Sequence, residues 1–205
     1  MPQPFGPAVM TTQGEALLAK ATAGKCKIEY VHMATGNGTY ADSEKSVAVL
    51  KERNKLKSAK NTYTFSDITV ENQNCVFLES LITNQDPVTQ KVLVSKGYYI
   101  NEIGIFAKEV GQEDTEAILY SICVTAGTNN NGDYMPPYNG YNRAEITQNY
   151  MITVNSSQDI TVNMKGAALL AEDANKLRDD TTKMKCKIGI DNGLKIGRAS
   201  CRERV

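Results

Sequence analysis

The sequence lacks an excess of charge of either sign. Lys and Arg together number 23, and Asp and Glu together also number 23, so the formal net charge is zero. A chain with this balance has no broad positive field to hold a phosphate backbone. We therefore expect no nucleic-acid partner.

Long apolar runs are also missing. No segment approaches the ~18 consecutive apolar residues that a membrane-spanning helix needs. The first nine residues, MPQPFGPAV, lack the charged and then apolar pattern of a signal peptide. We expect no membrane insertion, and we expect synthesis in a cytoplasm.

Patterns typical of catalysis and metal binding are absent as well. Neither G-x-S-x-G, H-E-x-x-H nor C-x-x-C occurs. The only histidine, His32, lies in the alternating segment CKIEYVHM, which predicts that it shares a strand face with Ile28 and Tyr30 and is structural. The cysteines are spaced singly, which favours reduced structural thiols: Cys26, Cys75, Cys123, Cys186 and Cys201. We predict no enzymatic activity, no metal and no cofactor.

Strand patterns dominate what is present. Residues 97–108, GYYINEIGIFAK, predict a strand interrupted at Asn101 and Glu102, with Gly104 as a bulge or a point of close approach. Residues 117–124 follow a turn at Gly111 and complete a hairpin. Further strands are expected at 26–33, 61–70, 74–83, 145–154 and 159–164. The fold class is therefore α+β, mainly an antiparallel sheet or sandwich of about six to eight strands.

Helices are expected at three places. Thr12 and Glu15 have the spacing of a capping box, and Gly24 is placed to end that first helix. Residues 41–60 are highly charged, with Val47 and Leu50 on one weak apolar stripe, and predict a solvated helix. The third helix lies near the end of the chain and is described below. Before the first helix, PQPFGP predicts an extended arm that either docks on a neighbour or frays.

Two loops invite functional hypotheses. The turn Gly36-Asn37-Gly38 lacks the Lys-Ser/Thr of a phosphate-binding loop and is interpreted as a simple connection. Residues 128–141, TNNNGDYMPPYNGY, carry three tyrosines on a polar loop. Tyrosine offers rigid amphipathic surface, so Tyr134, Tyr138 and Tyr141 are candidates for a protein interface or for stacking on sugar rings, with a packed loop as the alternative.

A short heptad-like seam follows the predicted sheet. Its residues are spaced alternately three and four apart, with charged residues outside the seam: Ala167, Leu170, Ala174, Leu177, Thr181 and Met184. The seam predicts association between chains along this helix. An amphipathic helix that folds back on the sheet is the alternative.

Three of these segments together resemble a known family. They are the helix from Thr11 through Lys20, the strand ending in Met33-Ala34-Thr35-Gly36-Asn37-Gly38, and the segment Asn101-Glu102-Ile103-Gly104-Ile105-Phe106. Their order and spacing resemble the N-terminal, tail-attachment domain of phage and prophage tail-collar or tail-fibre proteins, over residues 8–165. Asn101 stands where that family commonly has a basic residue.

The resemblance implies a structural virion protein that attaches a tail fibre to the baseplate or tail tip. It also implies a homotrimer, a location in the virion tail and synthesis in the bacterial host cytoplasm. Two alternatives remain: an adhesin module that binds host-surface glycans, or the non-catalytic N-terminal part of a tail-associated hydrolase.

The expected organisation has three parts. Residues 1–165 form the β-rich tail-attachment domain, and residues 166–194 form a helical connector that starts a fibre shaft. Residues 195–205, KIGRASCRERV, resemble a translated sequencing adapter and are left out of the fold argument. We expect the natural protein to continue beyond Leu194.

Overall fold

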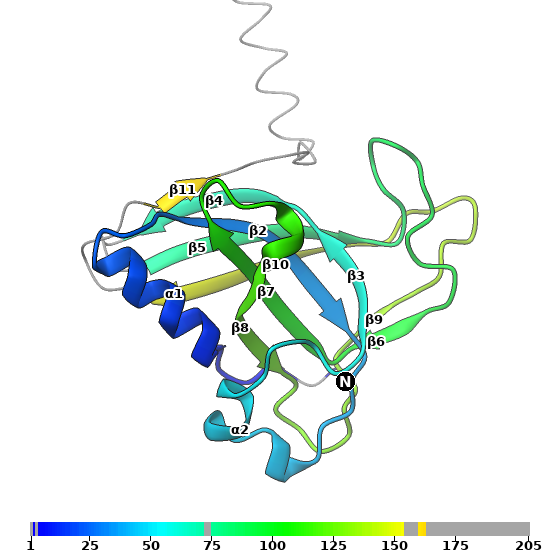
Figure 1. Ribbon diagram of the computed structural model, residues 1–205. Coiled ribbons are helices and arrows are strands. Elements are labelled where there is room, and N and C mark those ends of the chain that lie inside the picture. Colours follow the sequence, from blue (N-terminus) through cyan, green and yellow to red (C-terminus); the bar gives the residue numbers. More distant parts are fainter. Residues whose placement is uncertain (1, 3, 72–74, 154–159, 163–205) are drawn as a thin grey trace, which may run out of the picture. The chain divides into compact units, whose positions relative to one another are not determined.

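The computed structural model describes residues 2, 4–71, 75–153 and 160–162. These residues form a mainly antiparallel β-structure with few helices, as the sequence predicts (Figure 1). The helical elements are α1 (Thr12–Thr22), α2 (Val47–Lys51) and two short 3₁₀ turns, Asp42–Glu44 and Asp114–Glu116. The strands are β1 (Val9–Met10), β2 (Ile28–Gly36), β3 (Ala59–Tyr63), β4 (Phe65–Glu71), β5 (Cys75–Thr83), β6 (Tyr98–Ile100), β7 (Glu102–Glu109), β8 (Ile118–Val124), β9 (Asp133–Met135), β10 (Glu145–Thr153) and β11 (Ile160–Val162). The eleven strands of the described residues exceed the predicted six to eight, because short strands such as β1, β6 and β9 form only through pairing with distant segments.

The larger sheet has the order β1-β8-β7-β2-β11. Strands β7 and β8 form the hairpin expected from the sequence, and the break before Glu102 separates β6 from β7. The edge of β2 that faces away from β7 pairs with two strands. Strand β11 pairs parallel with the first three residues of β2, and β3 pairs antiparallel with its second half. Gly104 is a point of close approach, since a Cβ there would lie 2.7 Å from Leu119 Cδ1.

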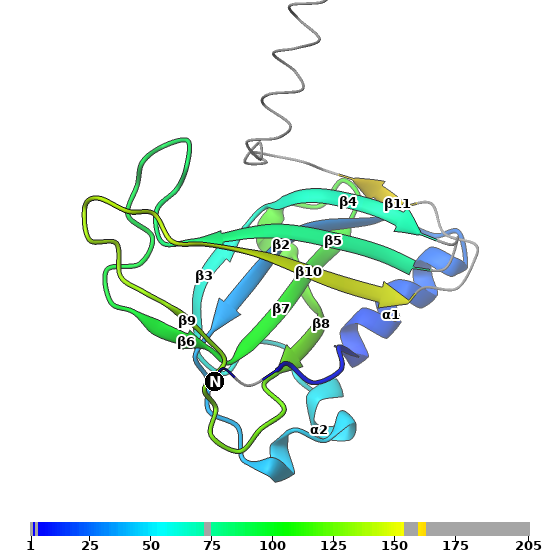
Figure 2. The same ribbon diagram turned by 180° about the vertical axis from the view of Figure 1, so that it is seen from behind.

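The smaller sheet has the order β10-β5-β4 and lies across the larger one (Figure 2). The chain passes from one sheet to the other at Thr64, between β3 and β4. Both sheets contribute to one hydrophobic core: Tyr30, Ile103, Ile105 and Tyr120 come from the larger sheet, and Phe65, Leu78, Ile82 and Ile152 from the smaller. Burial of these apolar side chains from both layers is what holds the two sheets together.

Helix α1 begins one residue earlier than its capping box predicts. The N-cap is Thr11, whose Oγ1 accepts a hydrogen bond from the Gly14 amide at 3.0 Å, so the expected box with Thr12 as its cap is wrong. Gly14 lets the helix approach β8, because a Cβ there would lie 2.2 Å from the Tyr120 carbonyl oxygen. The predicted end is confirmed: Gly24 has φ +68°, and the Lys25 amide donates to the Lys20 carbonyl at 3.0 Å.

A bulge in β2 overturns the predicted face of His32. Tyr30 pairs with Ala107 and His32 with Phe106, so Val31 is an extra residue against β7. The extra residue reverses the alternation: Ile28, Tyr30 and Met33 enter the main core. His32 therefore does not share a face with Ile28 and Tyr30, and its ring instead stacks on Phe106, with centroids 4.7 Å apart.

Residues 41–60 do not form the single solvated helix that was expected. The segment contains a 3₁₀ turn, the five-residue α2 and then the start of β3. Leu50 and Leu56 join Tyr40 in a second buried cluster with Leu119 and other residues of the larger sheet. Their burial on that sheet requires an irregular path, which overrides the helical spacing of the sequence.

The N-terminal arm pairs with its own domain. The Gly6 amide donates to the Val124 carbonyl at 2.8 Å, the Ala126 amide donates to the Pro4 carbonyl at 2.9 Å, and Phe5 forms a bridge with Thr125. The arm thus continues the edge that β1 forms on β8, which corrects the expectation of a frayed end. The predicted helix through residues 167–184, the connector 166–194 and the segment 195–205 lie outside the described residues.

Candidate functional site

The predicted tyrosine loop contains a strand. Strand β9 pairs antiparallel with β6, and Tyr99 stands directly opposite Tyr134. Alternation buries Tyr98, Ile100 and Met135 and turns the other two tyrosines outward, so that each is about half exposed (49% and 50%). Their rings lie 5.1 Å apart between centroids at 57°. We call β6 and β9 with this exposed pair the tyrosine ribbon.

The ribbon holds Tyr134 close to the backbone of Gly97. A Cβ on Gly97 would lie 2.2 Å from the Tyr134 hydroxyl oxygen, so this approach requires glycine. Gly97 also lines a neighbouring pocket of about 320 Å³ with mostly polar walls, among them Asn37, Lys60, Asn61, Ser95 and Lys96. An exposed aromatic pair therefore adjoins a pocket rich in hydrogen-bonding groups.

The three tyrosines predicted from the sequence do not form one cluster around Tyr134. Its ring contact is with Tyr99, which the sequence pattern treats as an ordinary strand residue. Tyr138 is partly buried, and its amide donates to the Val94 carbonyl at 2.9 Å. Tyr141 follows on the loop and is 90% exposed. The sequence feature that could have identified Tyr99 is its position between Tyr98 and Ile100, because alternation along a strand turns it outward when these two neighbours are buried.

A buried carboxylate lies where β7 begins. Glu102 is fully buried, and its Oε1 accepts hydrogen bonds from the Ser58 amide at 2.7 Å and the Gly38 amide at 3.1 Å. Its Oε2 accepts from the Lys57 amide at 2.8 Å and from the Tyr40 hydroxyl. We call Glu102 and these four donors the Glu102 cradle. Hydrogen bonds to a charged acceptor are the stronger class, so the cradle fixes two distant loops to β7.

The cradle explains the Gly36-Asn37-Gly38 turn. A Cβ on Gly36 or Gly38 would lie 2.4 or 2.7 Å from Glu102 Oε1. The glycines therefore admit a carboxylate of the protein itself, which agrees with their interpretation as a loop rather than a phosphate site. Burial and the bond to Glu102 raise the pKa of Tyr40 well above its ordinary value. The cradle was missed from the sequence, although Glu102 belongs to the segment that carries the family resemblance.

Asn101 joins the cradle to the tyrosine ribbon. It is 3% exposed, its amide donates to the Gly36 carbonyl at 2.9 Å, and its side-chain oxygen accepts from the Gly132 amide at 3.2 Å. The Thr125 amide donates to the Asn101 carbonyl at 3.0 Å. A buried asparagine that is hydrogen-bonded to Gly36, Thr125 and Gly132 thus occupies the position where the resembled family commonly has a basic residue.

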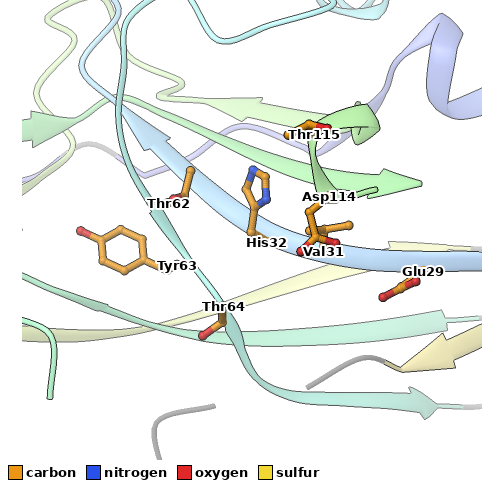
Figure 3. A pocket seen from close by; sticks show the side chains of 8 residues that line it. All are labelled: Glu29, Val31, His32, Thr62, Tyr63, Thr64, Asp114 and Thr115. Carbon is orange, nitrogen blue, oxygen red and sulfur yellow. The ribbon is translucent and has the colours of Figure 1, made fainter. Parts of the chain in front are cut away.

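His32 lines a separate pocket of about 310 Å³ on the outer edge of β2 (Figure 3). Glu29, Thr62, Thr64 and Asp114 also line it. Burial lowers the pKa of His32, and the nearby Asp114 carboxylate opposes this shift. A neutral imidazole stacked on Phe106 is typical of a structural histidine.

The rest of the described chain shows no gathered metal ligands. Within those residues, no three His, Cys, Asp or Glu side chains are grouped so that they could hold a metal ion. Cys26, Cys75 and Cys123 are free thiols, and burial raises the pKa of Cys123 to about 12. No helix among the described residues is long and apolar enough to cross a membrane.

Comparison with known protein families gives a match over most of the chain. The family model described as "Phage tail-collar fibre protein, N-terminal" matches residues 1–174 of this chain. Searches of curated proteins and of solved structures found no match. The matched range includes the Glu102 cradle, the tyrosine ribbon and both sheets.

Proposed function

Because this chain belongs to the phage tail-collar fibre protein family, we propose that it attaches a tail fibre to the baseplate or tail tip. The protein is a structural component of a phage tail, and membership of that family is the observation that carries the proposal. The Glu102 cradle supports a structural role, because all of its hydrogen bonds join parts of the chain to one another. The protein would be made in the bacterial host cytoplasm and act without catalysis.

Attachment can be tested on tails that lack this protein. The tagged 205-residue chain would be mixed with tails from a phage defective in the corresponding gene and then located by electron microscopy. We expect it at the baseplate or tail tip. Label along the tail tube, or no binding to tails that do accept the intact fibre, would contradict the proposal.

Trimer formation is the second part of the proposal. The seam of residues 167–184 would join three chains and begin the fibre shaft, because apolar residues spaced alternately three and four apart meet along coiled helices. Light scattering of the chain over a concentration series should give the mass of three chains or a multiple of three. Replacing Leu170 and Leu177 by Asp should remove this factor of three, whereas a parent chain whose mass is not a multiple of three would rule out trimer formation through this seam.

Glycan binding is a second candidate function, favoured by the tyrosine ribbon. Two adjacent half-exposed rings offer flat apolar surface for a sugar ring, and the neighbouring pocket supplies Asn, Ser and Lys groups for its hydroxyls or acidic substituents. A glycan array with host-surface polysaccharides would test it.

A single substitution identifies the residues involved. Tyr99→Ala should abolish glycan binding as fully as the triple replacement of Tyr134, Tyr138 and Tyr141 by Ala. Tyr141→Ala alone is the control, because Tyr141 is not part of the ring pair. If no glycan binds the parent chain, or if binding survives Tyr99→Ala, this candidate fails.

A further inference from the structure

The smaller sheet ends in a long open edge formed by β10. This strand pairs with β5 over nine consecutive residues, from Glu145 opposite Thr83 to Thr153 opposite Cys75, without a register shift. Within the part of the chain that the structure describes, its other side has no strand partner. A strand in that position presents a row of backbone donors and acceptors that can pair with another strand.

The other sheet edges in the described residues are short, irregular or shared. Strand β1 has two residues, and β3 shares its side of β2 with β11. Strand β4 is interrupted by a register shift between Phe65 and Asp67. Such features protect an edge from pairing, whereas β10 (EITQNYMIT) has no proline, lysine, glycine or bulge. Among these edges, β10 is therefore the one suited to receive a further strand.

The sequence of β10 is complementary to itself in one antiparallel register. With Asn149 on a two-fold axis, Ile146 of one copy faces Ile152 of the other, and Gln148 faces Tyr150. Glu145, the charged residue of the strand, faces Thr153, so no like charges meet. We propose that β10 pairs with β10 of a second copy of this chain, antiparallel and centred on Asn149.

The pairing would also complete the burial of apolar side chains. Ile146 is only partly buried at the edge of the main core, and Ile152 is 4% exposed in the same core. The proposed register brings Ile152 of the second copy against Ile146 on the inner face. The two smaller sheets then become one continuous sheet of six strands, β4-β5-β10 from each copy.

Charge reversal at the axis tests this register. Asn149 is exposed and lies opposite Glu79 of β5, so Lys there gains an oppositely charged neighbour and Asp a like-charged one, each worth less than about 1 kcal/mol. The fold should therefore stay intact in both variants, and the two copies of residue 149 would be direct cross-strand neighbours. Asn149→Lys and Asn149→Asp should each weaken pairing of the full chain by about fivefold at low salt, because like charges stand opposite one another. An equimolar mixture of the two variants should pair at least as well as the parent. Light scattering over a concentration series measures the mass in each case.

The controls separate this proposal from trimer formation. Pairing through β10 doubles the mass of the basic unit, whether that unit is a monomer or a trimer, so the two hypotheses fail independently. Thr69→Lys, on exposed β4 at the other side of the same sheet, should have the mass of the parent. Absence of doubling in the parent, or unchanged doubling in both Asn149 variants, would overturn the proposal. The edge would then be left to a strand of another tail protein.

Discussion

Strand β7 carries a buried carboxylate at its first residue and a buried ammonium near its end, and the protein satisfies the two charges differently. Glu102 receives hydrogen bonds from three backbone amides and one tyrosine hydroxyl. Lys108, whose side chain is 5% exposed, donates to Asp114 at 2.7 Å and to the Gln112 carbonyl at 2.6 Å, and it lies 3.7 Å from Glu29. The acid fixes the path of distant loops, whereas the base binds the turn that follows its own strand and two acidic side chains.

The two arrangements differ in their access to water. The Glu102 cradle is buried at its centre, with Glu102 fully buried and Tyr40 1% exposed, and only its Lys57 and Ser58 side reaches toward the surface. The Lys108 group opens to the surface through Asp114, whose side chain is 52% exposed. Water can therefore replace part of what Lys108 provides, whereas the buried Gly38 amide and Tyr40 hydroxyl would be left without an acceptor if Glu102 were removed. This comparison predicts unequal costs when either charge is removed.

The largest effect is expected for Glu102→Ala. This change removes the acceptor of four donors, of which those of Gly38 and Tyr40 are buried, and it opens a cavity. The free energy of unfolding should therefore fall by about 4 kcal/mol. Denaturant unfolding followed by circular dichroism measures the loss. Glu102→Gln keeps the volume and one carbonyl acceptor and should lose about half as much. A loss below about 1 kcal/mol for Glu102→Ala would mean that the cradle does not hold the loops.

A smaller loss is expected for Gly38→Ala. The added Cβ would lie 2.7 Å from Glu102 Oε1 and 2.8 Å from Lys57 Cβ, so the turn must move and the free energy of unfolding should fall by about 2 kcal/mol. The same change in the Glu102→Ala background should cost clearly less, because one of the two obstructing groups is gone. Equal costs in the two backgrounds would show that the glycine does not serve the carboxylate.

The Glu102 cradle also shows where prediction from the sequence ends. The strand break before Glu102 and the close approach at Gly104 are local features, and the pattern of glycine and apolar residues predicts both. The partners of Glu102 lie 64 residues away at Gly38 and 45 away at Lys57, so no local pattern indicates that this acid is buried. The pairing of Tyr99 with Tyr134 is equally non-local, which is why the sequence identified Tyr134 without its neighbour.

Two errors have a different cause. The bulge at Val31 adds one residue to β2, and a single added residue moves every later side chain to the other face, so the alternation placed His32 wrongly. In residues 41–60 the helical spacing of apolar residues is weak. Burial of Leu50 and Leu56 on the larger sheet therefore determines the path of the chain, and only a short helix forms there. Elements that follow strong periodicity were predicted correctly, whereas those that depend on one residue of register or on distant packing were not.

The next prediction concerns the other end of β7. Lys108→Met should lower the thermal midpoint of unfolding by less than Glu102→Ala does. The Asp114 carboxylate is 52% exposed and can be hydrated when Lys108 is removed. The Glu29 carboxylate is 8% exposed, and the neighbour that it loses lies at 3.7 Å, beyond hydrogen-bond distance. Differential scanning calorimetry of both variants measures the ranking. Lys20→Met is the control, since its ion pair with Glu109 is exposed and should contribute almost nothing. The reverse ranking of Lys108→Met and Glu102→Ala would refute the comparison.

The smallest expected effect is a pH dependence from His32, which lines the same pocket as Asp114. Burial holds the pKa of His32 below its ordinary value of about 6.5, so the unfolded chain binds this proton more readily than the folded one. Stability should therefore fall as the pH drops below about 6.5, until the folded pKa is reached. Because the chain has one histidine, proton NMR reports its titration directly.

In Lys108→Met the Asp114 carboxylate loses its ammonium partner, and the pKa of His32 should rise. A pKa at or above 6.5 in the parent chain would show that the imidazole is not desolvated as its stacking on Phe106 implies.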